Sequence, residues 1–274
     1  MGRGAVEDGA DLSRPAPNRR QYKLWACLPD IHVDLHDRRL LAAICDYLAD
    51  ERWDGMVQLG DFLDLNCIAR FNDGLPGRML DQTLEGDFEA GREVLDALLA
   101  GLRANNRKAR AVILEGNHEY RLVTRAEKDT ELRGSLDFDK RMGLAERNVE
   151  WLRAWSRNEM LVIGDVAFHH GKYTNVYNAR KHAQAFSGQH LYYGHTHTVQ
   201  EHHELLIGRS TIMAKSLGTL SGPLEWTHGD PDRWVPAFAV FYFFPDGTHQ
   251  EFTIKPVGGR FVAPNGKVYG RRQV

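Results

Sequence analysis

The feature that most constrains the fold is a repeated pairing of apolar runs with polar clusters. Five apolar runs with strand character are each followed directly by a short cluster of metal-ligating residue types. The clusters are Asp30-Ile-His32, Gly60-Asp61-Phe-Leu-Asp64, Gly116-Asn117-His118-Glu119, His169-His170-Gly171 and Gly194-His195-Thr-His197. A single cluster of this kind is ordinary turn chemistry. Open α/β sheets, however, gather their ligands at the carboxyl ends of strands, so five clusters in this position indicate one shared polar site.

The order of apolar runs predicts an α/β core. Tyr22–Leu28, Met56–Leu59 and Ala111–Leu114 are expected as buried strands, with amphipathic helices between them from about Asp37 and about Asp87. This alternation favours parallel strands. The second half is rich in strands and is expected to close a second sheet. Its expected strands are Val166–Phe168, Leu191–Tyr193, Ser210–Met213, Ala237–Phe244 and Glu251–Ile254.

The length of 274 residues suits one large domain. Residues 1–20 are expected to form a flexible tail, residues 21–257 the domain, and residues 258–274 a C-terminal extension. The charged segment 121–157 has helical texture, and we expect it to form a pocket wall or a lid.

The sequence contains no signal-peptide pattern and no apolar run of bilayer length, so we expect a cytoplasmic protein without a membrane partner.

Composition narrows the chemistry. The formal net charge is −2 and the sequence pI is about 6.7, so there is no global basic field of the kind that attracts nucleic acid. A nucleotide substrate is still compatible with this charge, because a metal centre can hold phosphate locally. Cys27, Cys45 and Cys67 include no Cys-x-x-Cys pair. We therefore expect free, buried thiols rather than disulfides or a thiolate zinc site.

In their order and residue types, the five clusters resemble the calcineurin-like metallophosphoesterase superfamily, over roughly Tyr22 to Gln200. The resemblance is closest to small bacterial and phage-type members. It implies an α/β fold, a four-layer αββα sandwich of two mixed β-sheets flanked by helices. It also implies a metal-dependent phosphoesterase with two divalent ions bound at the sheet ends.

The resemblance implies a role for each cluster residue. Asp30, His32 and His197 would hold one ion, Asn117, His170 and His195 would hold the other, and Asp61 would bridge them. Carboxylate, imidazole and carboxamide ligands without thiolate independently favour hard or borderline divalent ions. Manganese is expected first, with iron, zinc, cobalt or nickel as alternatives. A hydroxide bridging the two ions would be the nucleophile.

Three further residues near the ligands have expected roles. The resemblance makes His118 the acid that protonates or steadies the leaving oxygen, and Asp64 the residue that orients it. His169 and His170 are neighbours in an expected strand, so only one of them can point at the metals. The family pattern places the ligand immediately before Gly171, which selects His170. Trp226 and Trp234 are expected to pack within their turn rather than line the site.

Departures from the family bear on the substrate. Protein phosphatases of the family carry Asp-Arg-Gly in the second cluster and an Arg before Gly-Asn-His-Glu, whereas Leu65 follows Asp64 and Glu115 precedes Gly116 here. With fewer cations to neutralise a dianionic monoester, the sequence favours a phosphodiesterase acting on a small molecule or nucleotide. Arg70 or Arg121 could replace the missing arginines. The alternatives are a phosphomonoesterase or protein phosphatase, a nuclease acting on nucleic acid, and a non-catalytic binding scaffold with this fold.

Overall fold

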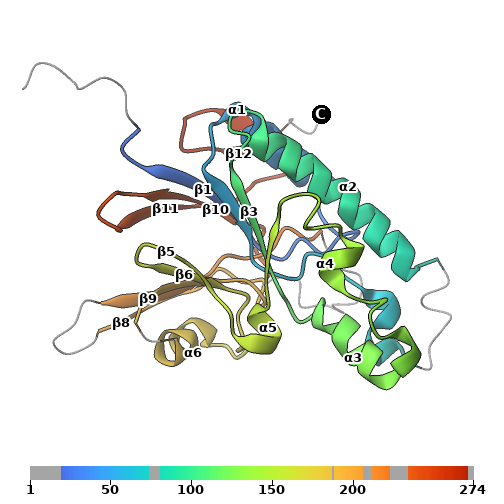
Figure 1. Ribbon diagram of the computed structural model, residues 1–274. Coiled ribbons are helices and arrows are strands. Elements are labelled where there is room, and N and C mark those ends of the chain that lie inside the picture. Colours follow the sequence, from blue (N-terminus) through green and yellow to red (C-terminus); the bar gives the residue numbers. More distant parts are fainter. Residues whose placement is uncertain (1–19, 74–80, 187, 206–210, 223–233, 271–274) are drawn as a thin grey trace, which may run out of the picture.

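The computed structural model describes residues 20–73, 81–186, 188–205, 211–222 and 234–270. Two mixed sheets lie face to face, with helices on their outer faces (Figure 1). This is the α/β sandwich of two mixed sheets flanked by helices that is expected from the sequence. The expected N-terminal tail and Trp226 lie outside the described residues, apart from Arg20. Among the described residues, no helix combines the length and apolar character needed to cross a membrane.

The first sheet has six strands in the order β11-β10-β1-β2-β3-β4. Strands β1, β2, β3 and β4 run parallel, while β10 and β11 are antiparallel to their neighbours. The bounds are β1 Lys23–Leu28, β2 Gly55–Gln58, β3 Arg110–Leu114, β4 Glu150–Leu152, β10 Phe238–Phe243 and β11 His249–Ile254. The expected parallel pairing of the first three strands is therefore confirmed.

The second sheet has five strands in the order β5-β6-β7-β9-β8. Its central strands β6, β7 and β9 are parallel, and the edge strands β5 and β8 are antiparallel. The bounds are β5 Leu161–Ile163, β6 Val166–His169, β7 His190–Tyr193, β8 Glu201–Glu204 and β9 Ile212–Ser216. The third expected strand of the second half is thus displaced toward the C-terminus, and the last two belong to the first sheet as β10 and β11 instead of closing the second. A separate hairpin joins β12 (Phe261–Val262) to β13 (Val268–Tyr269).

Helices cover the outer faces. The bounds are α1 Arg38–Asp50, α2 Leu84–Arg103, α3 Tyr120–Lys128, α4 Phe138–Arg141, α5 Ala154–Arg157 and α6 Asn178–Ala185, with short 3-10 helices at Asn66–Ile68, Arg70–Asn72 and Thr130–Leu132. Helix α1 begins where expected, because the Asp37 carboxylate accepts hydrogen bonds from the amides of Arg39 and Leu40. Helix α2 begins three residues before the expected Asp87, because Thr83 accepts a hydrogen bond from the Gly86 amide.

Successive side chains point to opposite faces of each strand and fill three apolar layers, one between the sheets and one on the outer face of each sheet. In β1, Leu24 and Ala26 pack toward α1 and α2, whereas Trp25 and Cys27 face the second sheet. In β7, Tyr192 faces the first sheet, and Leu191 and Tyr193 pack with residues of α6. Strands buried on both faces account for the nearly continuous apolar runs in the sequence. The inter-sheet layer fixes how the ends of the two sheets meet.

Phe168 lies at the centre of this layer. Its side chain is fully buried, and its ring centroid lies 5.1 Å from that of Phe241 and 6.1 Å from that of Tyr192. We predict that Phe168→Ala lowers the free energy of unfolding by about 3–5 kcal/mol, because the removed ring leaves a cavity between two sheets that cannot both relax. Urea unfolding measures the loss. Val162→Ala on the exposed side of β5 is the control, and a loss equal to that of the control would contradict the prediction.

Candidate metal centre

The carboxyl ends of β1, β2, β3, β6 and β7 bring all five polar clusters to one edge of the sandwich. The backbone ties the first two clusters together, because the His32 amide donates to the Asp61 carbonyl at 3.0 Å and the Asp64 amide donates to the Val33 carbonyl at 2.8 Å. Side chains from the two sheets meet there and are buried. Within this edge, three groups of side chains each offer several ligand atoms within 4.8 Å of one another; two of them share Asp61, and the third is His32, Asp64 and His118.

The first group contains Asp30, His32, Asp61 and His197. The Nε2 atoms of His32 and His197 lie 3.0 Å apart. The His197 Nε2 atom is 3.3 Å from Asp30 Oδ1, and the His32 Nε2 atom is 3.9 Å from Asp61 Oδ2. These are the three residues expected to hold one ion, together with the residue expected to bridge.

The second group contains Asp61, His170 and His195. The His170 Nε2 atom lies 3.4 Å from Asp61 Oδ2 and 3.0 Å from the side-chain oxygen of Asn117. The expected ligands of the second ion are therefore near one another. Because Asp61 belongs to both groups, its carboxylate lies between them.

The tautomers of two histidines show that these groups suit a cation. The Nδ1–H of His170 donates to the Leu59 carbonyl at 2.8 Å, and His32 Nδ1 lies 3.0 Å from Asp64 Oδ1. With Nδ1 engaged in both rings, both Nε2 atoms face carboxylate, carboxamide or imidazole groups. Asp30 Oδ2 is also buried without a hydrogen-bond partner. Several converging acceptors and an unpaired carboxylate oxygen fit a divalent ion.

The pKa shifts of His170 and Asp61 also indicate that this site is suited to positive charge. Burial acts to lower the pKa of His170, but Asp61, Asp30 and the Leu59 carbonyl raise it to about 9. Burial also acts to raise the pKa of Asp61, yet the imidazoles of His118, His170 and His32 lower it well below its usual range. A carboxylate that stays ionised although fully buried requires positive charge beside it.

The backbone of these clusters is strained. Asp30, His32, Asp61, His195 and His197 all have positive φ angles, between 34° and 67°. Non-glycine residues in this region cost free energy and collect at functional sites. Two glycines allow the carboxylates to approach the backbone. A Cβ on Gly116 would lie 2.1 Å from Asp61 Oδ1, and one on Gly194 would lie 2.1 Å from Asp30 Oδ2.

Asp64 lies against both His32 and His118, and its Oδ1 atom is 3.5 Å from His118 Nδ1. Its carboxylate is bonded to His32, while its backbone carbonyl accepts the hydrogen bond from His118 Nδ1 at 2.7 Å. The His118 Nε2 atom lies 3.8 Å from Asp61 Oδ2 and accepts a hydrogen bond from Arg121 Nη2 at 2.9 Å. Burial, together with His32 and Arg121, lowers the pKa of His118 to about 3.

Other residues considered from the sequence have structural surroundings. His169 is buried, with Nε2 bonded to the Ala154 carbonyl and Nδ1 accepting from the Gly171 amide. Its packed position agrees with the choice of His170. Cys27, Cys45 and Cys67 are free thiols; Cys27 is buried as expected, whereas Cys45 and Cys67 are only half-buried. The Cys67 thiol faces Asp87 Oδ2 at 3.4 Å.

Sequence reasoning misplaced Trp234. Its ring meets that of His197 edge-on, with centroids 4.1 Å apart, and it lines a cavity of about 850 Å³ that opens over the site. The same cavity is lined by Asp61, Asn117, His118, His195 and His197. Packing within the turn was therefore the wrong expectation for Trp234. Its distance in sequence from the clusters hid this position.

Glu119 was also missed. Its two carboxylate oxygens accept hydrogen bonds from the amides of Asp61, Leu63 and Gly116 at 2.9–3.0 Å. These bonds tie the second cluster to the third. Only the fold shows this role, because the burial that makes an acid require several donors is a property of the structure.

Comparison with known proteins gives no match to any protein-family model, and no curated protein matches. Solved structures do match. A single mutant of Vps29 from Entamoeba histolytica is 15% identical, with a TM-score of 0.40, over 85% of this chain and 99% of that one. Vacuolar Protein Sorting 29 from Cryptosporidium parvum is 13% identical, with a TM-score of 0.46, over 91% of this chain and 96% of that one.

Vps29 of Chaetomium thermophilum, complexed with a cyclic peptide, is 11% identical, with a TM-score of 0.42, over 91% of this chain and 93% of that one. Identities and TM-scores this low do not assign a family or an activity. None of these matches supports the bacterial or phage-type placement expected from the sequence.

The triple contact of Glu119 generates a prediction. In Glu119→Gln the amide NH₂ must face at least one backbone N–H, so we expect the free energy of unfolding to fall by about 1–3 kcal/mol. Because the Asp61 loop loses its anchor, we also expect weaker metal binding. Urea unfolding and competition with a chelator measure the two effects. The control is Glu127→Gln, an exposed acid on the same helix, and equal behaviour of the two variants would contradict the role of Glu119.

Proposed function

We propose that this protein hydrolyses a phosphodiester with two divalent metal ions. The observation that carries the proposal is the shared Asp61 carboxylate, which lies between two separate groups of imidazole and carboxylate ligands. Asp30, His32 and His197 would hold one ion, and Asn117, His170 and His195 the other. Manganese is the first candidate for both. When bound, such ions supply a hydroxide nucleophile and withdraw charge from the phosphoryl oxygens.

Residues beside the ligands orient the two histidine rings that the reaction would use. Asp64 fixes the His32 ring through its carboxylate and the His118 ring through its carbonyl. The neutral His118 ring presents Nε2 to Arg121, so a proton can be carried on Nε2 only once the guanidinium has moved. We place Arg121 as the cation that turns from His118 to a phosphoryl oxygen. Once freed, Nε2 would take up a proton from water, and His118 would pass that proton to the leaving oxygen.

The cavity over the site supports a diester rather than a monoester. Besides Asn117, its uncharged polar lining residues are Thr174, Asn175, Asn178, Thr196, Thr198 and Gln200. Among the lining residues in the described part of the chain, none is a lysine or an arginine. A phosphodiester carries a single negative charge, so it requires fewer cations than a dianionic monoester. A small molecule or a nucleotide fits this lining better than a polyanion such as nucleic acid.

A non-catalytic scaffold is the second candidate. It draws on the Vps29 structures, one of which is complexed with a cyclic peptide. The described site retains every expected ligand side chain as well as His118, whereas a scaffold has no need to keep them together. A phosphomonoesterase, a protein phosphatase or a nuclease would use the same ligands with another substrate.

Two variants separate binding of metal from turnover. We predict that His118→Ala keeps the bound metal but lowers kcat by about 10²–10⁴-fold, because only the proton transfer is lost. Asp61→Ala should lose metal as well, because both groups share this carboxylate. Metal content per chain and the rate of diester hydrolysis are measured together. Wild-type rates in both variants would place the active site elsewhere.

Metal dependence tests the substrate class directly. The chain is stripped of metal and resupplied with Mn²⁺, and hydrolysis of bis(p-nitrophenyl) phosphate is compared with that of p-nitrophenyl phosphate. We expect the diester to turn over faster and only with metal, because the cavity offers few cations to a dianion. A faster monoester would indicate a phosphatase. If metal binds and neither ester is hydrolysed, the scaffold is favoured.

A further inference from the structure

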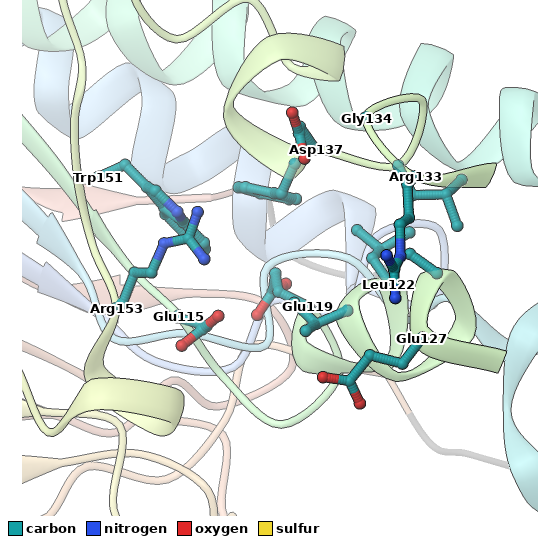
Figure 2. Close-up of a pocket in the computed structure, with 13 residues that line it drawn as sticks. Glu115, Glu119, Leu122, Glu127, Arg133, Gly134, Asp137, Trp151 and Arg153 are labelled. Atoms are coloured by element: carbon teal, nitrogen blue, oxygen red, sulfur yellow. The ribbon is translucent and has the colours of Figure 1, made fainter. Parts of the chain in front are cut away.

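A second cavity is lined by Glu119 and by none of the residues expected to bind metal. It measures about 230 Å³. Helix α3, the segment that leads into α4, and β4 enclose it (Figure 2). Most of its lining comes from segment 121–157, which the sequence predicted to form a pocket wall or lid. This cavity contains none of the metal ligands, so it is a separate site from the proposed active site.

Apolar side chains form about half of the lining of this cavity. Leu122 and Phe138 are buried, and the Phe138 ring packs against that of Trp151 with centroids 4.5 Å apart. Val123, Ala126 and Leu136 complete the apolar lining. A ligand held here would therefore present an aromatic or branched apolar body to the protein.

The carboxylates around the cavity already have partners. Both oxygens of Glu119 accept backbone amides, and Glu115 accepts hydrogen bonds from the amide and hydroxyl of Ser156. Asp137 forms an ion pair with Lys140. Glu127 is the remaining acid of the lining, and its side chain is exposed. The acids therefore have little capacity left to recognise a ligand.

Unlike most of these acids, the two arginines of the lining have no partner for their charge among the described residues. Figure 2 shows Arg153 and Trp151 on one side of the cavity and Arg133 on the other. Within the described part of the chain, neither guanidinium has a hydrogen-bonding or ion-pairing partner. A guanidinium offers a planar set of donors that matches a carboxylate. Two such groups line the cavity, where the only acid without a partner among the described residues is the exposed Glu127.

We propose that this cavity binds a small organic carboxylate with an aromatic or branched apolar body. Its carboxylate lies between Arg133 and Arg153, and its apolar body packs against Leu122, Phe138 and Trp151. The cavity is smaller than those that hold drug-sized ligands, so the ligand is small. Glu119 forms part of the lining and also holds the Asp61 loop, so this ligand binds directly behind the metal centre.

Calorimetry on the full, metal-stripped chain tests the site with two probes of the same shape and opposite charge, 3-phenylpropionate and 3-phenylpropylamine. We expect the carboxylate to bind and the amine to bind at least about tenfold more weakly, because the charged hydrogen bonds are lost. Arg133→Gln and Arg153→Gln should each weaken carboxylate binding by a similar factor. Arg157→Gln, an exposed arginine outside the cavity, is the matched control.

Two further variants test whether 3-phenylpropionate binds in this cavity rather than at the metal centre. Ala126→Phe fills the cavity and should abolish binding of 3-phenylpropionate. Asp61→Ala disrupts the metal centre and should leave that binding unchanged. Tighter binding of the amine, binding that survives both arginine substitutions, loss of binding in Asp61→Ala, or no binding of either probe would each overturn the proposal. None of these results depends on hydrolysis, so a failure here is distinct from a failure of the proposed function.

Discussion

The buried carboxylate of Asp61 imposes the constraint around which this molecule is arranged. It is 2% exposed and remains ionised, so it must be surrounded by donors and positive charge. The amide of His118 donates to its Oδ1 atom, and three imidazoles face its Oδ2 atom. These partners come from both sheets. The sheets must therefore meet with their carboxyl ends in register, and the apolar layer around Phe168 holds them there.

Holding ligands this close has conformational costs. Five ligand residues adopt positive φ angles, and two glycines are required where carboxylates approach the backbone. Hydrogen bonds outside the ligand set offset these costs. Glu119 fastens the loop of Asp61, and the Thr219 hydroxyl and the Leu220 amide both donate to the Asp30 carbonyl. The supporting residues are thus spread over more of the chain than the five clusters.

Much of the architecture could be predicted from apolar periodicity, because β1, β2, β3, β6 and β7 are buried on both faces. The clusters could be located because polar residues at strand ends follow directly from that pattern. Short or polar strands could not be predicted. Strands β4 and β5 have three residues each, and β8 reads Glu-His-His-Glu, so none shows a strand signal. The contacts of Trp234 and Arg121 depend on loop paths that the sequence pattern does not specify.

The ligand groups draw on two separate stretches of the chain. Asp30, His32, Asp61 and Asn117 come from the first stretch, and His170, His195 and His197 come from the second. Neither of the two groups that share Asp61 is complete within one stretch. On the ribosome, the metal centre cannot assemble until residue 197 has emerged, and β10 emerges later still to pair with β1. The centre is therefore a late product of synthesis, and complementation between two separately expressed halves of the chain could be followed through it.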